Sequence, residues 1–261
     1  MIYEICTQTH TGLVRTNNED AVAIDAATGL CILADGMGGY NAGEVASSMA
    51  VTFIKSELSR WLGQAGLNAN VKEVRRVLQI CVENSNYAVF NAGNANSKHK
   101  GMGTTLVVGV FQQNRLILGH IGDSRCYRLR GQEFQQITKD HSFLQEQIEA
   151  GHITPEQALT SNHRNLVTRA LGVEGTVRMD VNEHRVNVED IYLLCSDGLS
   201  DMVLDQEIAS ILLGNGRLDQ KSARLIAAAN HNGGHDNISI LLVHAQAAPT
   251  KRSLLSKLLR K

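Results

Sequence analysis

The sequence predicts an α+β fold in which two antiparallel sheets pack face to face and pairs of helices cover the outer faces. Long helical patterns come in pairs, and runs of short strands separate one pair from the other. Successive strands are joined by short turns, which is typical of antiparallel sheets. Residues 105–111 are apolar at nearly every position, so both faces of that strand should be buried.

The first third of the chain is expected to hold three strands and two long helices. Alternating residues predict the first strand, and a loop from Thr9 to Asp20 leads into the second. The third strand ends just before Asp35, where a loop rich in glycine begins. Apolar residues then recur at helical spacing. The predicted elements are strands at 2–7, 21–24 and 31–34 and helices at 42–62 and 71–91.

Two hairpins follow, each recognised from two strand patterns around a short turn. The turns are residues 112–115 and 131–132, and the strands are 104–111, 116–121, 124–130 and 133–137. Residues 138–172 then break the pattern, with one helix expected at 143–150 and a shorter one after Pro155. An insertion of this length usually serves as a lid or a substrate loop.

The last third repeats the alternation of strands with a helix pair. The predicted elements are strands at 177–185, 190–195 and 238–245 and helices at 204–213 and 220–230. Internal repeats and low-complexity segments are absent from the sequence.

The composition excludes several classes of protein. The net charge is −1 with acids and bases well mixed, so the basic face that nucleic-acid binding requires is missing. No apolar run approaches the ~20 residues that span a bilayer. The 5 cysteines are far apart in the sequence, and the N-terminus does not resemble a signal peptide. We therefore expect a cytoplasmic protein with reduced cysteines.

Four aspartates lie where predicted strands meet loops, and they are Asp35, Asp123, Asp197 and Asp236. One such residue would indicate only a turn, but four that converge indicate a centre with several metal ions. Carboxylates without a Cys or His pattern select hard cations such as Mg²⁺ and Mn²⁺. Two such ions can activate a water molecule and hold the oxygens of an in-line displacement at phosphorus.

A site of this kind also needs a positive group for the remaining phosphate oxygens. Arginine suits this role because its planar guanidinium binds two oxygens at once. Arg15 lies in the same loop as Glu19 and Asp20, so it is the candidate for binding phosphate.

At these positions the sequence resembles the metal-dependent protein serine/threonine phosphatases of the PP2C (PPM) family, bacterial branch. The similarity covers about residues 3–245 and rests on seven motifs in order. They are Arg15-Thr-Asn-Asn-Glu-Asp20, Ala34-Asp-Gly-Met-Gly-Gly39, Gly101-Met-Gly-Thr-Thr105, Gly122-Asp-Ser-Arg125, Thr138-Lys-Asp-His-Ser142, Ser196-Asp-Gly-Leu-Ser-Asp201 and His235-Asp-Asn-Ile-Ser239.

The resemblance implies a four-layer α-β-β-α sandwich with the metals at one end of the sheets. It implies a phosphatase domain over residues 1–245, with residues 140–170 as a flap that shapes substrate choice. Asp35 would bridge two metal ions, and the carbonyl of Gly36 would bind one of them. Asp197 and Asp236 would hold the other ion.

The same resemblance assigns the remaining roles. Glu19 and Asp20 would act near the metals through water, and Asp123, with Asp197, would hold a weaker third ion. Arg15 would bind the substrate phosphate, and Asn237 would orient groups beside Asp236.

One position departs from the pattern of many eukaryotic members, which carry a histidine directly after the Asp-Gly. Met37 stands there, and a thioether has no proton to give. The acid that protonates the leaving group is therefore open, with a metal-bound water preferred over His141.

The C-terminal tail, residues 246–261, differs from the rest of the chain. It carries five basic residues without acids, and four leucines share one helical face. The pattern permits a short amphipathic helix that contacts an acidic membrane surface or a partner protein. A solubilising tail without such a contact is the simpler interpretation.

The sequence thus predicts a monomeric, Mn²⁺- or Mg²⁺-dependent phosphatase acting on phosphoserine and phosphothreonine in proteins, by attack of a metal-bridging hydroxide. Its partners would be phosphoproteins, the substrates of a serine/threonine kinase. Two alternatives are a phosphoprotein-binding module without activity and a phosphoesterase for a small metabolite. The complete metal set argues against the binding module.

Overall fold

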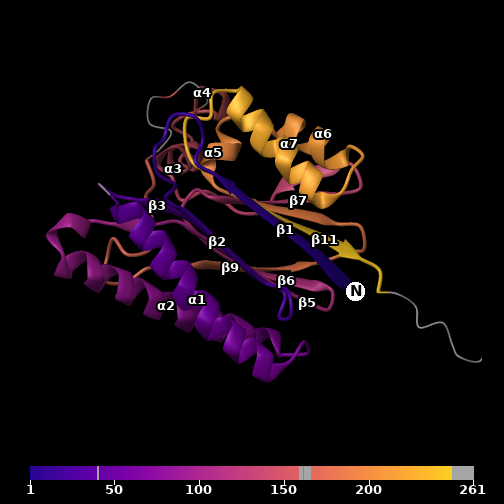
Figure 1. Ribbon diagram of the computed structural model, residues 1–261, viewed down its shortest axis with the longest axis horizontal. Helices are drawn as coiled ribbons and strands as arrows, with labels where there is room; N and C mark the ends of the chain where they lie inside the picture. Colours follow the sequence, from indigo (N-terminus) through magenta and orange to yellow (C-terminus); the bar gives the residue numbers. More distant parts are fainter. Residues whose placement is uncertain (40, 159–160, 162–165, 249–261) are drawn as a thin grey trace, which may run out of the picture.

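The computed structural model describes residues 1–39, 41–158, 161 and 166–248. Two antiparallel sheets pack face to face, and helices cover the outer face of each one (Figure 1). This arrangement confirms the predicted α-β-β-α layers. No helix in the described ranges is both long and apolar enough to cross a membrane.

The first sheet contains both the N-terminal and the last strand of the domain. Its strands in spatial order are β1 (Ile2–His10), β11 (Ile238–Gln246), β10 (Ile191–Cys195), β7 (Arg125–Arg130) and β8 (Glu133–Gln136). Helices α6 (Asp205–Leu213) and α7 (Leu218–His231) pack on its outer face (Figure 1).

The second sheet is built mainly from the first half of the chain. Its strands in order are β2 (Asp20–Asp25), β3 (Leu30–Met37), β5 (Leu106–Gln112), β6 (Arg115–Ile121) and β9 (Asp180–Arg185), and β4 (Gly103–Thr104) pairs with the end of β3. Helices α1 (Ala42–Ala65) and α2 (Val71–Ala95) cover its outer face. The remaining short helices are Ser97–His99, α3 (Phe143–Glu149), α4 (Pro155–Ala158) and α5 (Asp197–Ser200).

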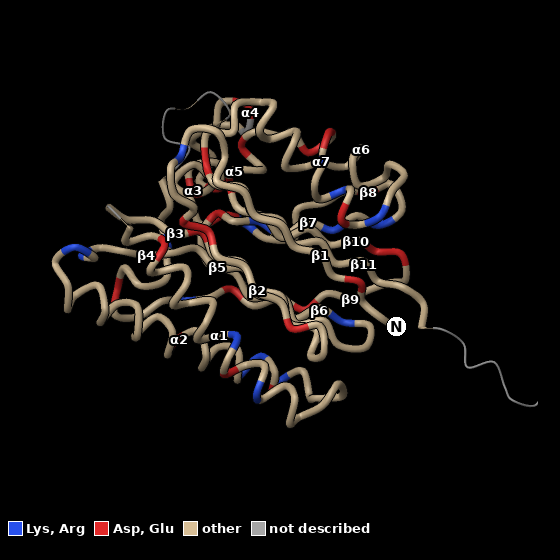
Figure 2. The backbone as a smooth tube through the Cα atoms, viewed as in Figure 1, with Lys and Arg blue, Asp and Glu red and all other residues tan. Residues whose placement is uncertain are grey.

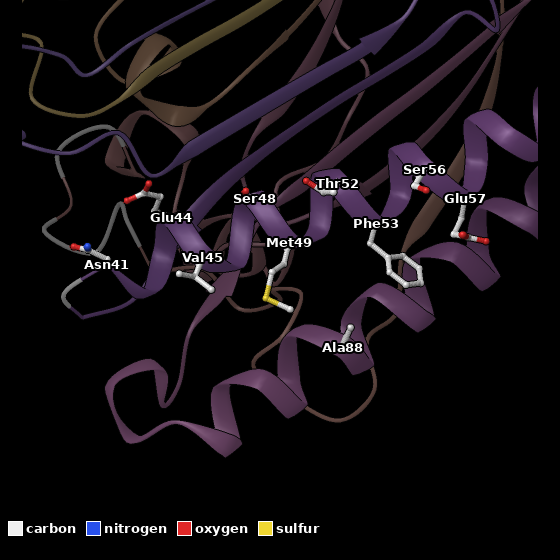
Figure 3. A pocket seen from close by; sticks show the side chains of 10 residues that line it. All are labelled: Asn41, Glu44, Val45, Ser48, Met49, Thr52, Phe53, Ser56, Glu57 and Ala88. Atoms are coloured by element: carbon white, nitrogen blue, oxygen red, sulfur yellow. The ribbon is translucent and has the colours of Figure 1, made fainter.

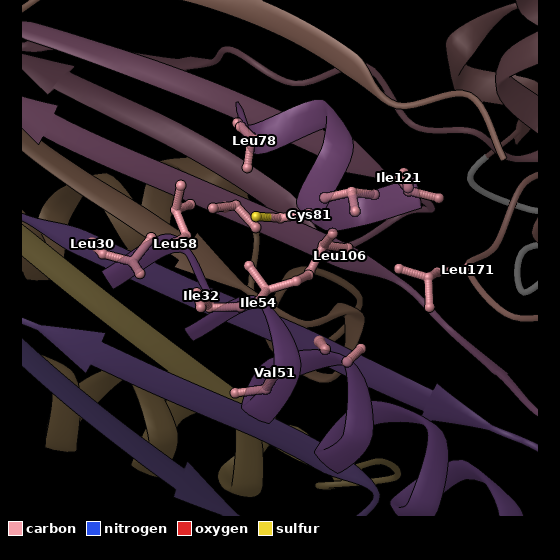
Figure 4. Packing of buried hydrophobic residues seen from close by; sticks show 14 of the residues in the cluster. Leu30, Ile32, Val51, Ile54, Leu58, Leu78, Cys81, Leu106, Ile121 and Leu171 are labelled. Carbon is pink, nitrogen blue, oxygen red and sulfur yellow. The ribbon is translucent and has the colours of Figure 1, made fainter. Parts of the chain in front are cut away.

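Three apolar clusters fill the spaces between the layers. Figure 4 shows the first, where Ile54 and Leu58 of α1 pack against Leu30 and Leu106 of the second sheet. A second cluster lies beneath α6 and α7, and a third lies between the sheets. The inner strands β3, β5, β6, β10 and β11 are therefore buried on both faces, which explains their nearly continuous apolar sequences.

Several element boundaries differ from the sequence prediction, and three of the differences affect the site. Strand β3 continues through Met37 because Gly36 and Met37 pair with β4, so the prediction that Asp35 lies in a loop is wrong. Asp20 is the first residue of β2 rather than the end of a loop, and it pairs with Asp35. Asp123 does not end a strand, since β6 stops at Ile121.

Two predictions fall partly outside the described residues. The tail from 249 to 261 and residues 159–160 and 162–165 of the expected flap are not described. The described part of the flap region contains α3 and α4, where the sequence predicts two helices.

Candidate metal and phosphate site

One end of the two sheets gathers the acidic residues that the sequence singles out. Figure 2 shows acidic segments meeting near the end of β3. The carboxylates of both sheets are close enough to influence one another's ionisation. They are Asp20, Asp35, Asp123, Asp197 and Asp236.

Asp35 and Asp20 lie directly opposite each other on paired strands. The backbone N–H of Asp35 donates to Thr105 Oγ1 at 3.0 Å, and its carbonyl accepts from the Thr105 N–H at 2.8 Å. Ser196 Oγ, from the other sheet, donates to Asp20 Oδ2 at 2.8 Å. Hydrogen bonds from both sheets therefore fix this pair at the junction of the layers.

The other three carboxylates come from segments at the same end. Asp197 is the first residue of α5, immediately beyond β10. Asp123 lies buried in the turn between β6 and β7, and Asp236 lies two residues before β11. The sheet brings these three segments to one end, because β11, β10 and β7 are antiparallel neighbours in that order.

The surroundings disfavour negative charge on these groups. Burial, followed by the charge of neighbouring carboxylates, raises the pKa of Asp35 and of Asp197 well above the usual range. Burial is also the largest influence on Asp20, whose pKa rises to about 7, and on Asp123, whose pKa rises to about 6. Without a cation, this end of the protein holds more negative charge than it can stabilise.

The guanidinium of Arg15 reaches into this cluster. Its Nη2 lies 2.7 Å from Asp236 Oδ2, while about half of the side chain stays exposed. The pKa of Arg15 is raised, first by the hydrogen bond to Asp236 and then by that residue's charge. The backbone N–H of Leu13 donates to the Gly234 carbonyl at 2.8 Å and fixes the loop that carries Arg15.

Asn237, the residue before β11, connects that loop to Asp236. Its Oδ1 accepts from the Glu19 N–H at 2.7 Å, and its Nδ2 donates to the carbonyls of Thr11 and Asn17, each at 2.9 Å. Its own backbone N–H donates to Asp236 Oδ1 at 2.8 Å. The amide thus positions both the Glu19 segment and Asp236.

Gly36 is packed so closely that no side chain fits there. A Cβ would lie 2.1 Å from the Gly43 carbonyl oxygen at the start of α1. The Gly36 N–H donates to the Glu19 carbonyl at 3.1 Å, which brings the Glu19 segment against β3. Burial raises the pKa of Glu19, and the charge of Arg15 opposes that rise.

The donor set suits a hard divalent cation. Two buried carboxylate oxygens, Asp20 Oδ1 and Asp197 Oδ1, have no hydrogen-bond partner among the described residues, and such atoms call for a ligand or an ion. Oxygen donors with excess negative charge match Mg²⁺ or Mn²⁺. Among the described residues no three His, Cys, Asp or Glu side chains are already arranged to hold an ion.

Sequence reasoning missed several residues that support the site. Ser196 and Thr105 bind the Asp20–Asp35 pair, and Thr105 Oγ1 lies 2.7 Å from Ser124 Oγ. Asp201 is also close enough to raise the pKa of Asp123 and of Asp197. All four residues occur in the recognised motifs, but the sequence alone does not show which residue each side chain contacts.

His141, the second candidate for the acid, is held within the structure. Its Nδ1 accepts from the Gly122 N–H at 3.0 Å, and its ring lies 4.5 Å from that of His120. Burial, followed by the charge of Arg169, lowers its pKa. These contacts suit a neutral imidazole that supports the turn of Asp123.

A groove on the outer helices is separate from this chemistry. It measures about 720 Å³, and Met49 and Phe53 of α1 point towards Ala88 of α2 across it (Figure 3). None of the predicted site residues lines it.

Comparisons with known proteins identify the family of the chain. Residues 10–239 match the family model for protein phosphatase 2C. A serine/threonine phosphatase, stp, of Listeria innocua is 36% identical over 239 residues, covering 90% of this chain and 93% of that protein.

Solved structures show the same likeness. A serine/threonine phosphatase of S. agalactiae superposes with a TM-score of 0.87 at 34% identity, covering 94% of this chain and 100% of that one. The catalytic domain of the phosphatase PstP, in complex with two manganese ions, gives 0.83 at 37% identity, covering 94% and 99%. The chain therefore belongs to the protein phosphatase 2C family.

Proposed function

We propose that this protein is a divalent-metal-dependent phosphatase that removes phosphate from phosphoserine and phosphothreonine in proteins. The observation that carries the proposal is the convergence of five carboxylates, two of which have unpartnered buried oxygens. Membership of a family of protein phosphatases and the manganese ions of the PstP structure support it.

The family pattern assigns a metal-binding role to each of these oxygen donors. Asp35 and the Gly36 carbonyl would hold one ion, and Asp35, Asp197 and Asp236 would hold a second. Asp123 with Asp197 suits a weaker third ion, while Glu19 and Asp20 would act through water. Bound there, the ions supply Lewis-acid activation of water and neutralise charge on the phosphate oxygens.

Arg15 would position the substrate. Its guanidinium now donates to Asp236, and it would exchange this carboxylate for two phosphate oxygens when Asp236 binds a metal ion. Asn237 would keep Asp236 and the loop of Arg15 in register during that exchange, because it is hydrogen-bonded to both.

The remaining proposals concern the setting of the reaction. Residues 1–245 would form the catalytic domain, with residues 140–170 as a flap over the substrate. We expect a monomer acting in the cytoplasm on the products of a serine/threonine kinase, and the unpaired state of all five cysteines supports a reducing compartment. The tail from 246 to 261 would contact a membrane or partner, or keep the protein soluble.

The test is hydrolysis of a phosphothreonine peptide with and without Mn²⁺, for the wild type and for Asp236→Asn. The matched control is Asp219→Asn, which removes an exposed carboxylate of α7. We expect metal-dependent turnover that is lost in Asp236→Asn and kept in the control. A folded, Mn²⁺-loaded wild type that hydrolyses glucose 6-phosphate but not the peptide would contradict the proposal.

A further inference from the structure

Another cavity lies between the edges of the two sheets, and His120, which lines it, stacks on the His141 ring that supports the turn of Asp123. It measures about 290 Å³ and is bounded by β6 and β9 on one side and by β7, β8 and the residues after β8 on the other. Strand register turns its lining inwards: Leu118 pairs with Asn182 and His120 with Asp180 across β6 and β9, and Leu118 belongs to the core between the sheets.

Three buried nitrogen atoms of the residues that line this cavity have no hydrogen-bond partner in the part of the chain that the structure describes. They are His120 Nε2, Arg128 Nε and His184 Nε2. Only 3% of His120 is exposed. Buried polar atoms are nearly always paired in folded proteins, and those that are not commonly indicate an ion, a ligand or ordered water.

The metal and phosphate site also contains unpartnered buried atoms, but they are oxygens rather than nitrogens. There the unpartnered atoms are the carboxylate oxygens of Asp20 and Asp197, which suit a cation. Here they are nitrogens, and the guanidinium N–H of Arg128 can only donate. A group that fills this cavity must therefore accept hydrogen bonds.

The charges around the cavity also favour an anion. Within the described ranges no carboxylate forms an ion pair with Arg128, whose Nη2 donates to the neutral Gln135 at 3.0 Å. Burial, followed by the charge of Arg128, lowers the pKa of His184, so these two side chains are close to each other.

Asp180, the acidic residue that lines the cavity, already has two partners. Asp180 Oδ1 lies 2.9 Å from Arg169 Nη1, and its Oδ2 lies 3.4 Å from His141 Nε2. Lys139, which also lines the cavity, pairs with Glu149 at 2.5 Å. The charge of Arg128 is thus the one that an incoming anion would neutralise.

We propose that this cavity binds a small phosphate-class oxyanion, held by Arg128 with His184 and His120 as further partners. A guanidinium gives such an anion short, charge-assisted hydrogen bonds. Inorganic phosphate and the phosphate group of a phosphorylated residue share this chemistry.

The experiment follows the imidazole signals of His120 and His184 by NMR in the full-length, Mg²⁺-loaded protein. Inorganic phosphate and O-phosphothreonine are titrated separately, which distinguishes the two sources. Arg128→Gln removes the proposed anchor, and Arg76→Gln removes an exposed arginine of α2 as a matched control. His184→Gln, observed through the His120 signal, gives a second test should Arg128→Gln not fold.

We expect saturable shifts of both signals, with binding at least about tenfold weaker in Arg128→Gln and in His184→Gln and unchanged in Arg76→Gln. The probe that binds more tightly identifies the source. Absence of a saturable shift with both probes, or equal binding by wild type and Arg128→Gln, would overturn the proposal.

Discussion

Buried aspartates occur in two contrasting settings in this protein. Asp190, only 1% exposed, accepts two hydrogen bonds from Arg130 at 2.9 and 2.7 Å and a third from the Asn187 N–H at 2.8 Å. Burial alone would raise its pKa, but these bonds lower it overall. Asp35 and Asp197 lie among other carboxylates, and the pKa of each is raised.

The difference separates structural carboxylates from those that await a ligand. A carboxylate with its own arginine and backbone donors is satisfied by the fold and stabilises it. A group of carboxylates that lie against one another is satisfied only when a cation arrives. Asp140, which Arg125 binds through two nitrogens, belongs to the first kind although it lies near Asp123.

The largest expected effect comes from neutralising a carboxylate of the second kind. Asp197→Asn should lower kcat/KM for a phosphothreonine peptide by at least about 100-fold, because it removes a metal ligand. It should also raise the melting temperature of the metal-free protein, since one of the repelling charges is gone. Thermal unfolding in EDTA checks the second effect. A fall in Tm would show that the charge of Asp197 does not destabilise the metal-free protein.

The opposite result is expected for a carboxylate of the first kind. Asp190→Asn should lower the free energy of unfolding by about 2–3 kcal/mol, towards the low end for a broken buried pair because Arg130 is about one third exposed. Urea unfolding measures this loss. The folded variant should keep its phosphatase activity, and an activity loss as large as that of Asp197→Asn would show that the two settings do not differ.

The pH dependence of stability sharpens the same contrast. Asp20 and Asp123 have folded pKa values of about 7 and about 6, above the ~4 of an unfolded aspartate. Between these values the folded state binds more protons, so stability falls as pH rises. The metal-free protein should therefore melt several degrees higher at about pH 5.5 than at about pH 7.5.

Metal should reverse that trend. Cations compete with protons for the same oxygens, so added Mn²⁺ should raise Tm more at the higher pH. An unchanged Tm across this range in EDTA would contradict the raised pKa values.

The smallest effect is expected at Arg15, which is bonded to Asp236 of the carboxylate cluster. Arg15→Lys keeps the charge but loses the planar pair of donors, so KM for the phosphopeptide should rise by roughly tenfold with a smaller change in kcat. Steady-state kinetics with saturating Mn²⁺ measures it. A change in kcat alone would place Arg15 outside substrate binding.

Patterns along the chain predicted most of the fold. The spacing of apolar residues gave both helix pairs, and the short turns gave the hairpins, because these signals are local. The end of β3 was missed because its last residues are ordered by β4, whose two residues carry no strand pattern of their own.

The candidate site was predictable to the extent that strand ends carry acids. The residues that hold the site in place could not be predicted. Ser196 contacts Asp20 across 176 residues of sequence, and only the packing of two sheets creates that contact. The cavity beside Arg128 could not be predicted either, since four different strands, β6, β7, β8 and β9, each contribute between one and three side chains to it.

The most direct test counts the Mn²⁺ ions that bind to the chain, by EPR titration of wild type, Asp35→Asn and Asp190→Asn. We expect two tightly bound ions in wild type, the number in the PstP structure, the same number in Asp190→Asn, and loss of tight binding in Asp35→Asn. Equal Mn²⁺ binding by wild type and Asp35→Asn, or none by a folded wild type, would contradict the account.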